Sequence, residues 1–411
     1  MTGPVRILSV GNMYPPHHQG GYELVWQSAN RWARAQGHVV RVVTSTHRDL
    51  TVADADEPDV HRTLRWYWDW DRYAFERLPI AARIRIERTN AAQLRRHLRA
   101  FRPDVVAWWS MGHMSLGLIE QVRRAGIPAI LSIHNDWLVY GPKADQWTGL
   151  WLDRSPVLAA AADRALGLPT VFRPAAAGRL VFNSRYSLRA AAAAGIASPD
   201  SEIIHPGIAR EFTDPAPAAP WRWRLLYAGR IDRGKGVDTA VAALEQLPEA
   251  RLAIHGKGDA AYTDELRSLA RDLGAADRVA FGEFADPGGL RRAYAEADAV
   301  LFPVRWQEPW GLVPLEAMGM GRPVVATAGG GTTEFIAHEH NALVVAPDDP
   351  AGLAAAVGRL AADPGLRASL VRGGLDTARR HTAAEFDRRT VEAIVGAAGL
   401  PRGRAGQTAI A

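Results

Sequence analysis

The sequence predicts an α/β protein with two domains, each built on a doubly wound parallel sheet with helices on its faces. Three observations indicate this class. Short apolar runs typical of buried strands alternate with polar loops and helical spacings. The alternation begins again in the second half, after a proline-rich stretch. The length of 411 residues fits two domains, since one domain usually takes about 100 to 200 residues.

The first half opens with the apolar run 5–10, which predicts a buried strand. A loop rich in Pro, His and Gly follows, and Leu24, Ser28 and Trp32 then recur at helical spacing. A further helix is expected over 80–101. The other apolar runs that we expect to form strands in this half are 39–44, 105–109, 129–133 and 179–182.

The second half repeats this order of strands and helices. The expected strands are 224–228, 251–255, 278–281, 299–302, 323–327 and 342–345. The expected helices are 238–246, 263–273 and 383–398. In open parallel sheets, ligands bind beyond the carboxyl ends of the strands, so we expect the chemistry in loops that follow strands, with a cleft between the domains as the default site.

The domain boundary is expected in the stretch Asp214-Pro-Ala-Pro-Ala-Ala-Pro220, which has too many prolines for a helix interior or a central strand. We therefore predict an N-terminal domain over 1–205, a linker over 206–220 and a C-terminal domain over 221–381. A helix over 382–400 follows and is a candidate to pack back onto the N-terminal domain. The tail 401–411 is expected to be flexible.

The composition excludes several classes of protein. Without any Cys there is no disulfide framework, thiolate metal site or cysteine nucleophile. The start of the chain lacks the pattern of a secretory signal, and no run approaches the ~20 apolar residues of a spanning helix, so we expect a cytoplasmic protein. Residues 1–205 carry 25 Lys and Arg against 18 Asp and Glu, so the first half is the one expected to meet anions or a membrane.

A glycine-punctuated loop with two cations follows the expected strand 224–228. It contains Arg230 and Lys235 and leads into a helix. Free N–H groups at a helix start, together with a guanidinium and an ammonium, can contact different oxygens of one diphosphate. The alternative is an ordinary solvated turn with surface Arg and Lys.

Two carboxylates eight positions apart, Glu308 and Glu316, follow the expected strand 299–302. If a helix begins near Leu312, its first N–H groups can hold a phosphate, and Gly311 lets the backbone approach a ligand. Glu316, about one turn inside, can accept hydrogen bonds from a ribose diol, and Glu308 can reach a sugar. The alternative is that Glu316 is a buried residue tied to a neighbouring Arg and that Glu308 is a loop charge.

Four motifs in order resemble one known family. These are Gly20-Gly21-x-Glu23, the Gly229 to Gly236 loop, Glu308-x7-Glu316 and Gly329-Gly-Gly-x2-Glu334. The ordered set resembles the retaining glycosyltransferases of family 4, with the GT-B fold of two facing Rossmann-like domains and an interdomain cleft. The resemblance implies a metal-independent retaining hexosyltransferase of carbohydrate biosynthesis that has no cofactor.

The resemblance further implies that a nucleoside diphosphate sugar, with UDP or GDP as its nucleotide, is the donor and lies mainly on the second domain. The acceptor, a hydroxyl of a small molecule, a glycan or a lipid-linked compound, would bind the first. The expected catalytic residues are His134, Glu308, Arg230 and Lys235. The alternative for His134 is an ordinary loop histidine whose hydrogen bonds are satisfied within the protein. The expected donor-binding residues are Gly20, Gly21, Arg230, Lys235, Gly256, Phe281, Glu308, Trp310, Gly311, Leu312, Val313 and Glu316.

An aromatic segment in the first half is the expected acceptor surface, because rings stack on sugars and on other flat apolar faces. Core packing is the alternative. The segment also contains Asp69-x-Asp71, but it lies in the half without the phosphate motifs, so no metal site is expected. The expected acceptor-binding residues are Trp66, Trp68, Trp70, His113 and Trp137.

The expected helix 80–101 places apolar residues on one face and six Arg on the rest. Peripheral contact with anionic lipid and a solvated face on an ordinary packed helix are both open. Nucleic-acid binding is not expected, since the positive excess is small. The alternative functions are a glycoside phosphorylase, a sugar-nucleotide epimerase or a nonenzymatic sugar-nucleotide-binding protein.

Overall fold

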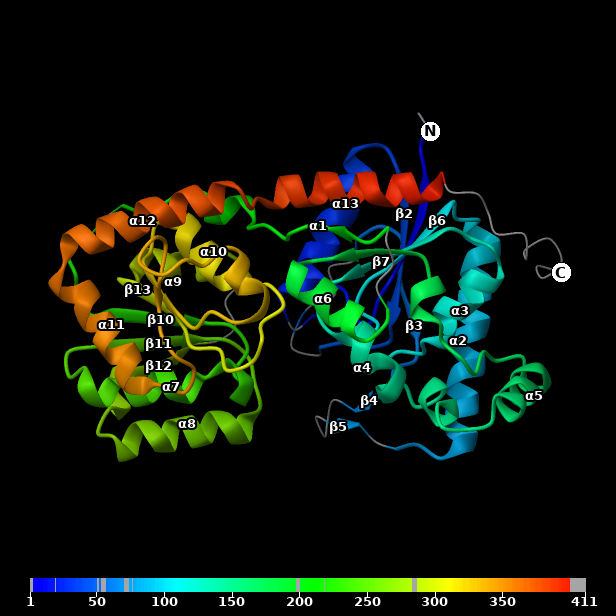
Figure 1. Cartoon of the computed structure of the whole chain (residues 1–411), viewed down its shortest axis with the longest axis horizontal. Helices are drawn as coiled ribbons and strands as arrows, with labels where there is room; N and C mark the ends of the chain where they lie inside the picture. Colours follow the sequence, from blue (N-terminus) through cyan, green and yellow to red (C-terminus); the bar gives the residue numbers. More distant parts are fainter. Residues whose placement is uncertain are drawn as a thin grey trace. The chain divides into compact units, whose positions relative to one another are not determined.

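The computed structural model describes residues 3–18, 20–49, 52, 57–69, 74–75, 77–196, 200–217, 219–282 and 287–399. It divides into two compact units, one of Met1–Ile204 with Asp387–Ala411 and one of His205–Phe386. In each unit, helices lie on the faces of one parallel sheet (Figure 1). The expected tail 401–411 lies outside the described residues.

The first unit contains a seven-stranded parallel sheet in the order β3-β2-β1-β6-β7-β8-β9. Its inner strands are buried almost throughout, because helices cover both faces. Its strands are β1 (Arg6–Val10), β2 (Val39–Ser45), β3 (Val60–Leu64), β6 (Val105–Trp108), β7 (Ala129–Ile133), β8 (Arg179–Phe182) and β9 (Glu202–Ile203). A separate antiparallel pair joins β4 (Trp68–Asp69) and β5 (Ala74–Phe75).

The helices of this unit connect successive strands. They are α1 (Gly21–Ala35), α2 (Ile80–Phe101), α3 (Gly117–Arg124), α4 (Trp137–Ala144), α5 (Pro156–Leu166) and α6 (Arg185–Ala193), with short 3-10 turns η1 (Thr148–Trp151) and η2 (Pro174–Ala176). Among the described residues, no helix is long and apolar enough to cross a membrane.

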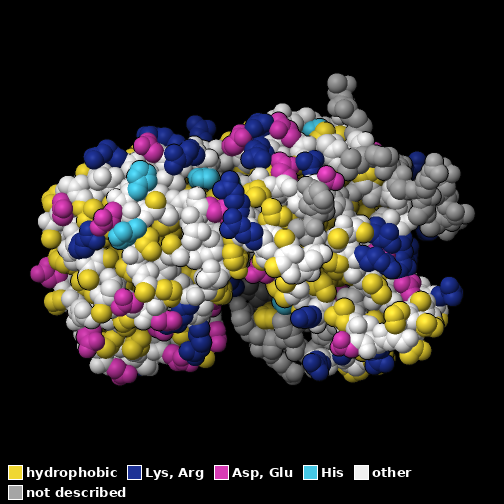
Figure 2. Space-filling view, in the orientation of Figure 1, with side chains coloured by type: hydrophobic (Ala, Val, Ile, Leu, Met, Phe, Trp, Pro, Cys, Tyr) yellow, Lys and Arg dark blue, Asp and Glu magenta, His cyan; other side chains and the backbone are white. Residues whose placement is uncertain are grey.

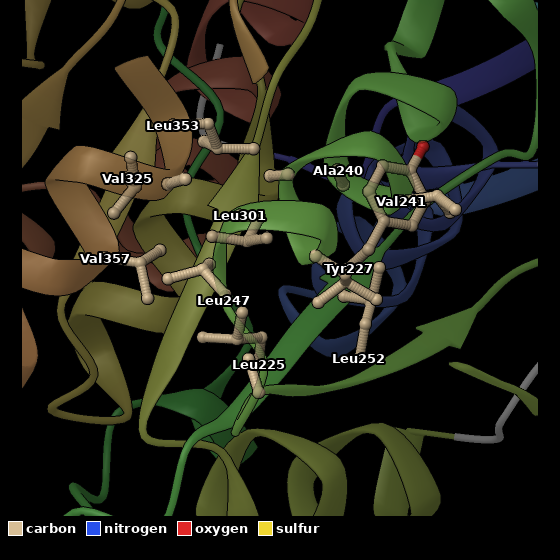
Figure 3. Close-up of a cluster of buried hydrophobic side chains, with 14 of the residues drawn as sticks. Leu225, Tyr227, Ala240, Val241, Leu247, Leu252, Leu301, Val325, Leu353 and Val357 are labelled. Atoms are coloured by element: carbon tan, nitrogen blue, oxygen red, sulfur yellow. The ribbon is translucent and has the colours of Figure 1, made fainter. Parts of the chain in front are cut away.

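The second unit has a six-stranded parallel sheet in the order β12-β11-β10-β13-β14-β15. The strands are β10 (Arg224–Ala228), β11 (Arg251–His255), β12 (Val279–Gly282), β13 (Ala299–Phe302), β14 (Val324–Ala326) and β15 (Leu343–Val344). Figure 3 shows how side chains from its strands, such as Leu225 and Leu301, meet Ala240, Leu353 and Val357 from the covering helices. This core fixes the strand ends from which the functional loops leave.

The helices of the second unit are α7 (Val237–Ala242), α8 (Ala260–Asp272), α9 (Pro287–Glu296), α10 (Leu312–Gly319), α11 (Pro350–Ala362) and α12 (Pro364–Arg379). Its 3-10 turns are η3 (Arg210–Phe212), η4 (Arg233–Lys235), η5 (Ala243–Gln246), η6 (Ala276–Arg278) and η7 (Gly330–Glu334). The expected helix 238–246 is therefore an α-helix that tightens into a 3-10 turn.

The expected α/β class is confirmed, and several elements have the expected bounds, among them strands 129–133, 179–182, 224–228 and 299–302 and helix 80–101. Strands β3 and β9 were not predicted. Four of the five residues of β3 are only partly buried, since it is an edge strand, and its sequence has a mixed polarity that does not indicate a strand. Strand β9 has only two residues.

Part of the expected linker 206–220 packs onto the second unit. Ile208 and Phe212 are buried in a core cluster of that unit. The backbone of Ile208 also pairs with the segment after α12, donating to His381 at 2.9 Å and accepting from Ala383 at 2.9 Å. The prolines in this stretch indicated a linker, but these two apolar side chains anchor it.

The last helix, α13 (Ala383–Ala398), belongs with the first unit from Asp387 onwards. Ser28 Oγ donates to Asp387 Oδ2 at 2.5 Å, and Arg389 donates to Glu202 at 3.2 Å and to the carbonyl of Ile203 at 3.1 Å. Burial raises the pKa of Asp387 to about 7. A titrating carboxyl therefore lies where the helix attaches.

Replacing Asp387 with Asn should stabilise the folded protein relative to wild type, and this stabilisation should increase as the pH rises from 5 to 8. The unfolded carboxyl titrates near 3.8 and the folded one at about 7, so folding takes up a proton between these values and wild-type stability falls as the pH rises through 7. The upper bound of this loss is about 4 kcal/mol. The melting temperature of Asp387→Asn, relative to wild type, should rise across this range, whereas that of Asp376→Asn, on an exposed helix surface, should not. Parallel plots of melting temperature against pH for Asp387→Asn and wild type would contradict the raised pKa of Asp387.

Candidate functional site

The loops after β10 and β13, two neighbouring strands of the second sheet, carry a cluster of charged groups. Lys235 Nζ lies 2.6 Å from Glu308 Oε2, and each side chain is only 15% exposed. The indole N–H of Trp306 donates to the same carboxylate oxygen at 2.6 Å. The structure thus brings together Lys235 and Glu308, which lie far apart in the sequence.

The ring of Trp306 also contacts both cations of the expected diphosphate site. Lys235 Nζ lies 4.8 Å and the Arg230 guanidinium carbon 5.6 Å from the ring centre, within the range of cation–π attraction. Arg230 also lies 3.5 Å from Asp232 and keeps 42% of its side chain exposed. The two cations therefore lie on one aromatic ring, with the Arg230 guanidinium accessible to an anion.

Two glycines allow the loop after β10 to approach its neighbours. Gly236 has a φ of +67°, and a Cβ there would lie 1.9 Å from the carbonyl oxygen of Pro303. A Cβ on Gly234 would lie 2.3 Å from the Trp306 ring. Only glycine fits at these positions without displacing the backbone or the ring.

The Glu308 loop is held from the side by the Gly-rich turn 329–331. Gly331 N donates to the Glu308 carbonyl at 2.7 Å, and Gly330 N donates to Gln307 Oε1 at 2.7 Å. The loop leads into α10 through Gly311, whose φ is +85°. The first turn of α10, with Leu312 and Val313, presents its N–H groups at this end, as expected for an anion site.

Glu316 lies one turn inside α10 and is half-buried. Tyr294 OH donates to its Oε2 at 2.8 Å, so its partner is a tyrosine and not the Arg that the alternative reading named. Burial raises the pKa of Glu316 to about 7, while the Tyr294 hydrogen bond opposes this shift and the Glu211 charge adds to it. A carboxyl in this state can gain a full charge when donors of a ligand reach it.

Gly256, expected to bind the donor, has a structural reason to be glycine. A Cβ there would lie 1.8 Å from the carbonyl oxygen of Gly229, because the loops after β10 and β11 lie side by side. Gly229 N donates to the His255 carbonyl at 3.0 Å in the same contact. Phe281, on β12, is half-buried, with the Arg267 guanidinium 5.0 Å from its ring centre.

Trp310, an expected donor-binding residue, has its side chain turned into the core. This side chain is 2% exposed, stacks on His205 with ring centres 4.3 Å apart, and donates its indole N–H to the Pro206 carbonyl at 2.9 Å. Its position next to Gly311 suggested a ligand contact, but the ring packs into the core beneath the loop.

In the first unit, the glycines of the loop after β1 lie near His134. Gly20 N donates to Glu23 Oε2 at 3.0 Å, and Gly21 begins α1. Tyr22 stacks on His134, at the end of β7, with ring centres 4.6 Å apart. Burial lowers the pKa of His134 to about 3, so its imidazole is neutral at pH 7.

The expected acceptor residues divide into two groups. Trp68, on β4, stacks on His113 with ring centres 5.6 Å apart, and Trp66 donates its indole N–H to the Gly112 carbonyl at 3.1 Å, so these three residues lie together. Trp137 is fully buried in the core cluster of the first unit, so assigning it to a binding surface was wrong. Trp70 lies outside the described residues.

Helix α2 fixes the start of this aromatic segment through two buried polar side chains. Tyr67 OH donates to Glu87 Oε1 at 2.6 Å, and Asn90 exchanges two hydrogen bonds with the backbone of Arg65. Burial and the neighbouring Asp145 carboxyl raise the pKa of Glu87. The aromatic surface is therefore positioned before any ligand binds.

Three residues of these sites were not predicted, namely Tyr22, Tyr294 and Trp306. Tyr22 directly follows the Gly20-Gly21 motif, so its place in the sequence could have indicated it. Trp306 is 38% exposed, which is unusual for so large a ring, but no spacing in the sequence predicts this contact. Asp71 of the Asp-x-Asp pair lies outside the described residues.

Two family descriptions match consecutive parts of this chain. Residues 19–212 match Glycosyltransferase Family 4, and residues 222–363 match Glycosyl transferases group 1. Among curated proteins, D-inositol 3-phosphate glycosyltransferase of Acidothermus cellulolyticus is 37% identical over 243 residues, which cover 54% of this chain and 53% of that protein. Glycogen synthase of Mycobacterium tuberculosis is 36% identical over 171 residues, which cover 41% and 40%. The chain thus spans about half the length, or less, of these relatives.

Solved structures resemble the fold over nearly the whole chain. Sucrose-phosphate synthase of Thermosynechococcus elongatus has a TM-score of 0.71 at 21% identity, covering 95% of this chain and 98% of that one. Anabaena HepE in complex with UDP and glucose has a TM-score of 0.70 at 20% identity, covering 95% and 99%. These likenesses show the fold, and the two family matches, which agree with the four ordered motifs, show that the chain belongs to glycosyltransferase family 4, whose fold is GT-B.

Proposed function

We propose that this glycosyltransferase transfers a sugar, with retention at the anomeric carbon and without a metal, from a nucleoside diphosphate sugar to an acceptor hydroxyl. The observation that carries the proposal is the cluster of Arg230, Lys235, Glu308 and Trp306 beside the start of α10. It offers two cations, helix N–H groups and a carboxylate within one strand-end region. UDP is the first nucleotide to test, since the structurally similar HepE was solved with UDP.

The leaving group of this reaction is a diphosphate, so stabilisation of its negative charge is the main catalytic requirement. As the anomeric carbon–oxygen bond breaks, Arg230 and Lys235 stabilise the departing charge in place of a metal ion. Lys235 has three N–H donors and can keep its bond to Glu308 while it contacts a phosphate oxygen. The N–H groups of Leu312 and Val313 add a second contact to the diphosphate.

The sugar itself is held by groups with different charges. Glu308 accepts hydrogen bonds from sugar hydroxyls, and Glu316 accepts them from the ribose. His134 is neutral and can donate or accept a hydrogen bond at the sugar without adding charge. The acceptor oxygen attacks from the face that the diphosphate leaves, and its proton passes to the departing phosphate.

The aromatic group of Trp66, Trp68 and His113 is the proposed acceptor surface. Burial lowers the pKa of His113 to about 4, so it presents a neutral ring at pH 7. Neutral stacked rings favour the apolar face of a sugar or another flat, uncharged group. We therefore propose that the acceptor carries such a group next to the reacting hydroxyl. We also propose that the enzyme is cytoplasmic, as the sequence analysis predicts.

Thermal unfolding with UDP, GDP, ADP and dTDP in EDTA tests the donor class. A ligand that binds the folded chain stabilises it by about 2.7 kcal/mol at a hundred times its Kd. We expect a rise in melting temperature with one of these diphosphates. Stabilisation by orthophosphate alone would instead favour a phosphorylase, and loss of binding in EDTA would overturn metal independence.

Replacing Lys235 with Ala should reduce donor turnover on the order of 10²- to 10³-fold, because one contact to the leaving group is lost. The matched control is Arg233→Ala, two residues away, whose side chain is mostly exposed and pairs with Glu265 at 2.6 Å. The rate of donor hydrolysis or transfer, compared with the melting temperature, measures the effect. A Lys235→Ala rate within threefold of wild type would remove the diphosphate assignment.

Two substitutions of Trp306 should separate its ring from its N–H group. Trp306→Phe keeps a ring beside the cations, so the Kd for UDP should stay within about threefold while turnover falls about tenfold as Glu308 loses a donor. Trp306→Leu also removes the ring, so the Kd should rise about tenfold. Calorimetric titration and initial rates measure both values. Equal effects of the two substitutions on the Kd would show that the ring does not position the cations.

Donor affinity should increase with pH between 6 and 8. If the ribose needs the ionised Glu316, whose pKa is about 7 in the free protein, the Kd for UDP-glucose should fall about tenfold over this range. UDP-glucose is the probe because its diphosphate does not titrate there. Glu316→Gln should bind weakly at every pH and show a flat profile, and Glu316→Ala should raise the donor KM strongly. A flat wild-type profile would contradict the ribose role.

A further inference from the structure

A cluster of four aromatic rings lies beneath the Glu308 loop. Trp310, from this loop, stacks on His205 with ring centres 4.3 Å apart and 11° between the ring planes. The ring centre of His381 lies 5.2 Å from that of Trp310 and 5.9 Å from that of His205, edge-on to both. The ring centre of Phe335 lies 5.0 Å from that of Trp310 and 6.1 Å from that of His381. We call these four residues the ring cluster.

Histidines are unusual in a largely apolar cluster. Figure 2 shows charged side chains and some histidines at the surface of the second unit, where water surrounds them. Trp310 and Phe335 are instead only 2% and 7% exposed, and the two histidines of the ring cluster are half-buried beside them. Burial, His205 and Arg380 together lower the pKa of His381 to about 4, so this imidazole is neutral at pH 7 and packs as an aromatic ring.

The two histidines belong to segments whose backbones are held together. Ile208, three residues after His205, donates its backbone N–H to the carbonyl of His381 at 2.9 Å. A Cβ on Gly207 would lie 2.2 Å from the carbonyl carbon of Thr382, so only glycine lets the two backbones come this close. The two imidazoles therefore extend toward Trp310 from one joined pair of segments.

Two connections lead from the ring cluster to the Glu308 loop. The first is Trp310, which donates its indole N–H to the Pro206 carbonyl at 2.9 Å and directly precedes the glycine before α10. The second is the turn η7, which ends next to Phe335 and whose Gly331 N–H donates to the Glu308 carbonyl at 2.7 Å. The backbone of the Glu308 loop is therefore held by two segments that both reach the ring cluster.

We propose that His205 and His381 are positioning residues of the donor site and act through Trp310. Their rings fix the direction in which the indole leaves the Glu308 loop, and this in turn fixes the Glu308 carboxylate and the first N–H groups of α10. The expected effect on turnover rests on the proposed function, which places the donor sugar at this loop. The expected effect on the loop itself does not depend on the proposed function.

Hydrogen exchange of the full chain without ligand tests the positioning of the loop. His381→Leu keeps an apolar side chain but loses the ring, so peptides that cover 308–313 should exchange about tenfold faster than in wild type. His381→Phe keeps a ring and should restore the wild-type exchange. The matched control is Trp221→Leu, which removes one ring of the edge-on pair with Trp223 before β10 and should leave these peptides unchanged. Unchanged exchange of 308–313 in His381→Leu would overturn the proposal.

Turnover of UDP-glucose, measured well below the melting temperature of each variant, separates positioning from loss of stability. The kcat of His381→Leu should fall about 10- to 100-fold, since a small displacement of a group that contacts the substrate has a cost of this order. The Kd for UDP should rise only about threefold, because Arg230 and Glu316 are held by contacts outside the ring cluster. His381→Phe should restore kcat. A lower melting temperature with a wild-type kcat, as we expect for Trp221→Leu, would overturn the positioning role of His381.

His205→Leu and His205→Phe repeat the comparison from the other segment, with circular dichroism to show that each variant is folded. Because both histidines act through Trp310, the double variant His205→Leu/His381→Leu should lose less kcat than the product of the two single losses. Fully multiplicative losses would overturn the shared route through Trp310. Absence of UDP-glucose turnover in wild type would contradict the proposed function, whereas faster exchange of 308–313 in both leucine variants would still support the positioning of the loop.

Discussion

The ion pair between Lys235 and Glu308 is the interaction on which the second-unit site depends. It connects loops that leave two adjacent strands, β10 and β13, and so fixes the distance between the glycine loop and the start of α10. The partners are mostly shielded from water, so the pair is screened less than a surface pair. Removing one partner leaves the other charge poorly compensated, which makes the pair a constraint on loop position as well as a source of chemistry.

Three carboxyl groups of the structure have different hydrogen-bond donors around them. Glu308 has an ammonium and an indole N–H beside it, whereas Glu316 accepts from a tyrosine hydroxyl, and burial together with the Glu211 charge raises its pKa. Glu87 is buried with Tyr67 and Ser115 as donors. Glu308 is therefore held in a fixed contact, whereas Glu316 can change its charge when a ligand binds.

The fold could be predicted from the sequence to a large extent because parallel strands buried on both faces leave continuous apolar runs. The motifs also predicted that Lys235 and Glu308 belong to one site. Contacts that depend on side-chain direction could not be predicted in the same way. Trp310 and Trp306 are four residues apart, yet one ring packs into the core and the other lies under the two cations. A sequence shows where an aromatic residue occurs, but not which side of a loop it takes.

The attachment of α13 makes the first unit discontinuous along the chain. Its sheet is synthesised within the first 204 residues, but the helix that binds Ser28 and Glu202 follows the whole second unit in the sequence. During synthesis, the first unit therefore remains without this helix until the whole second unit has been translated. A fragment that ends after the first sheet would lack this helix permanently, so the first unit can be completed only after the second unit has been synthesised.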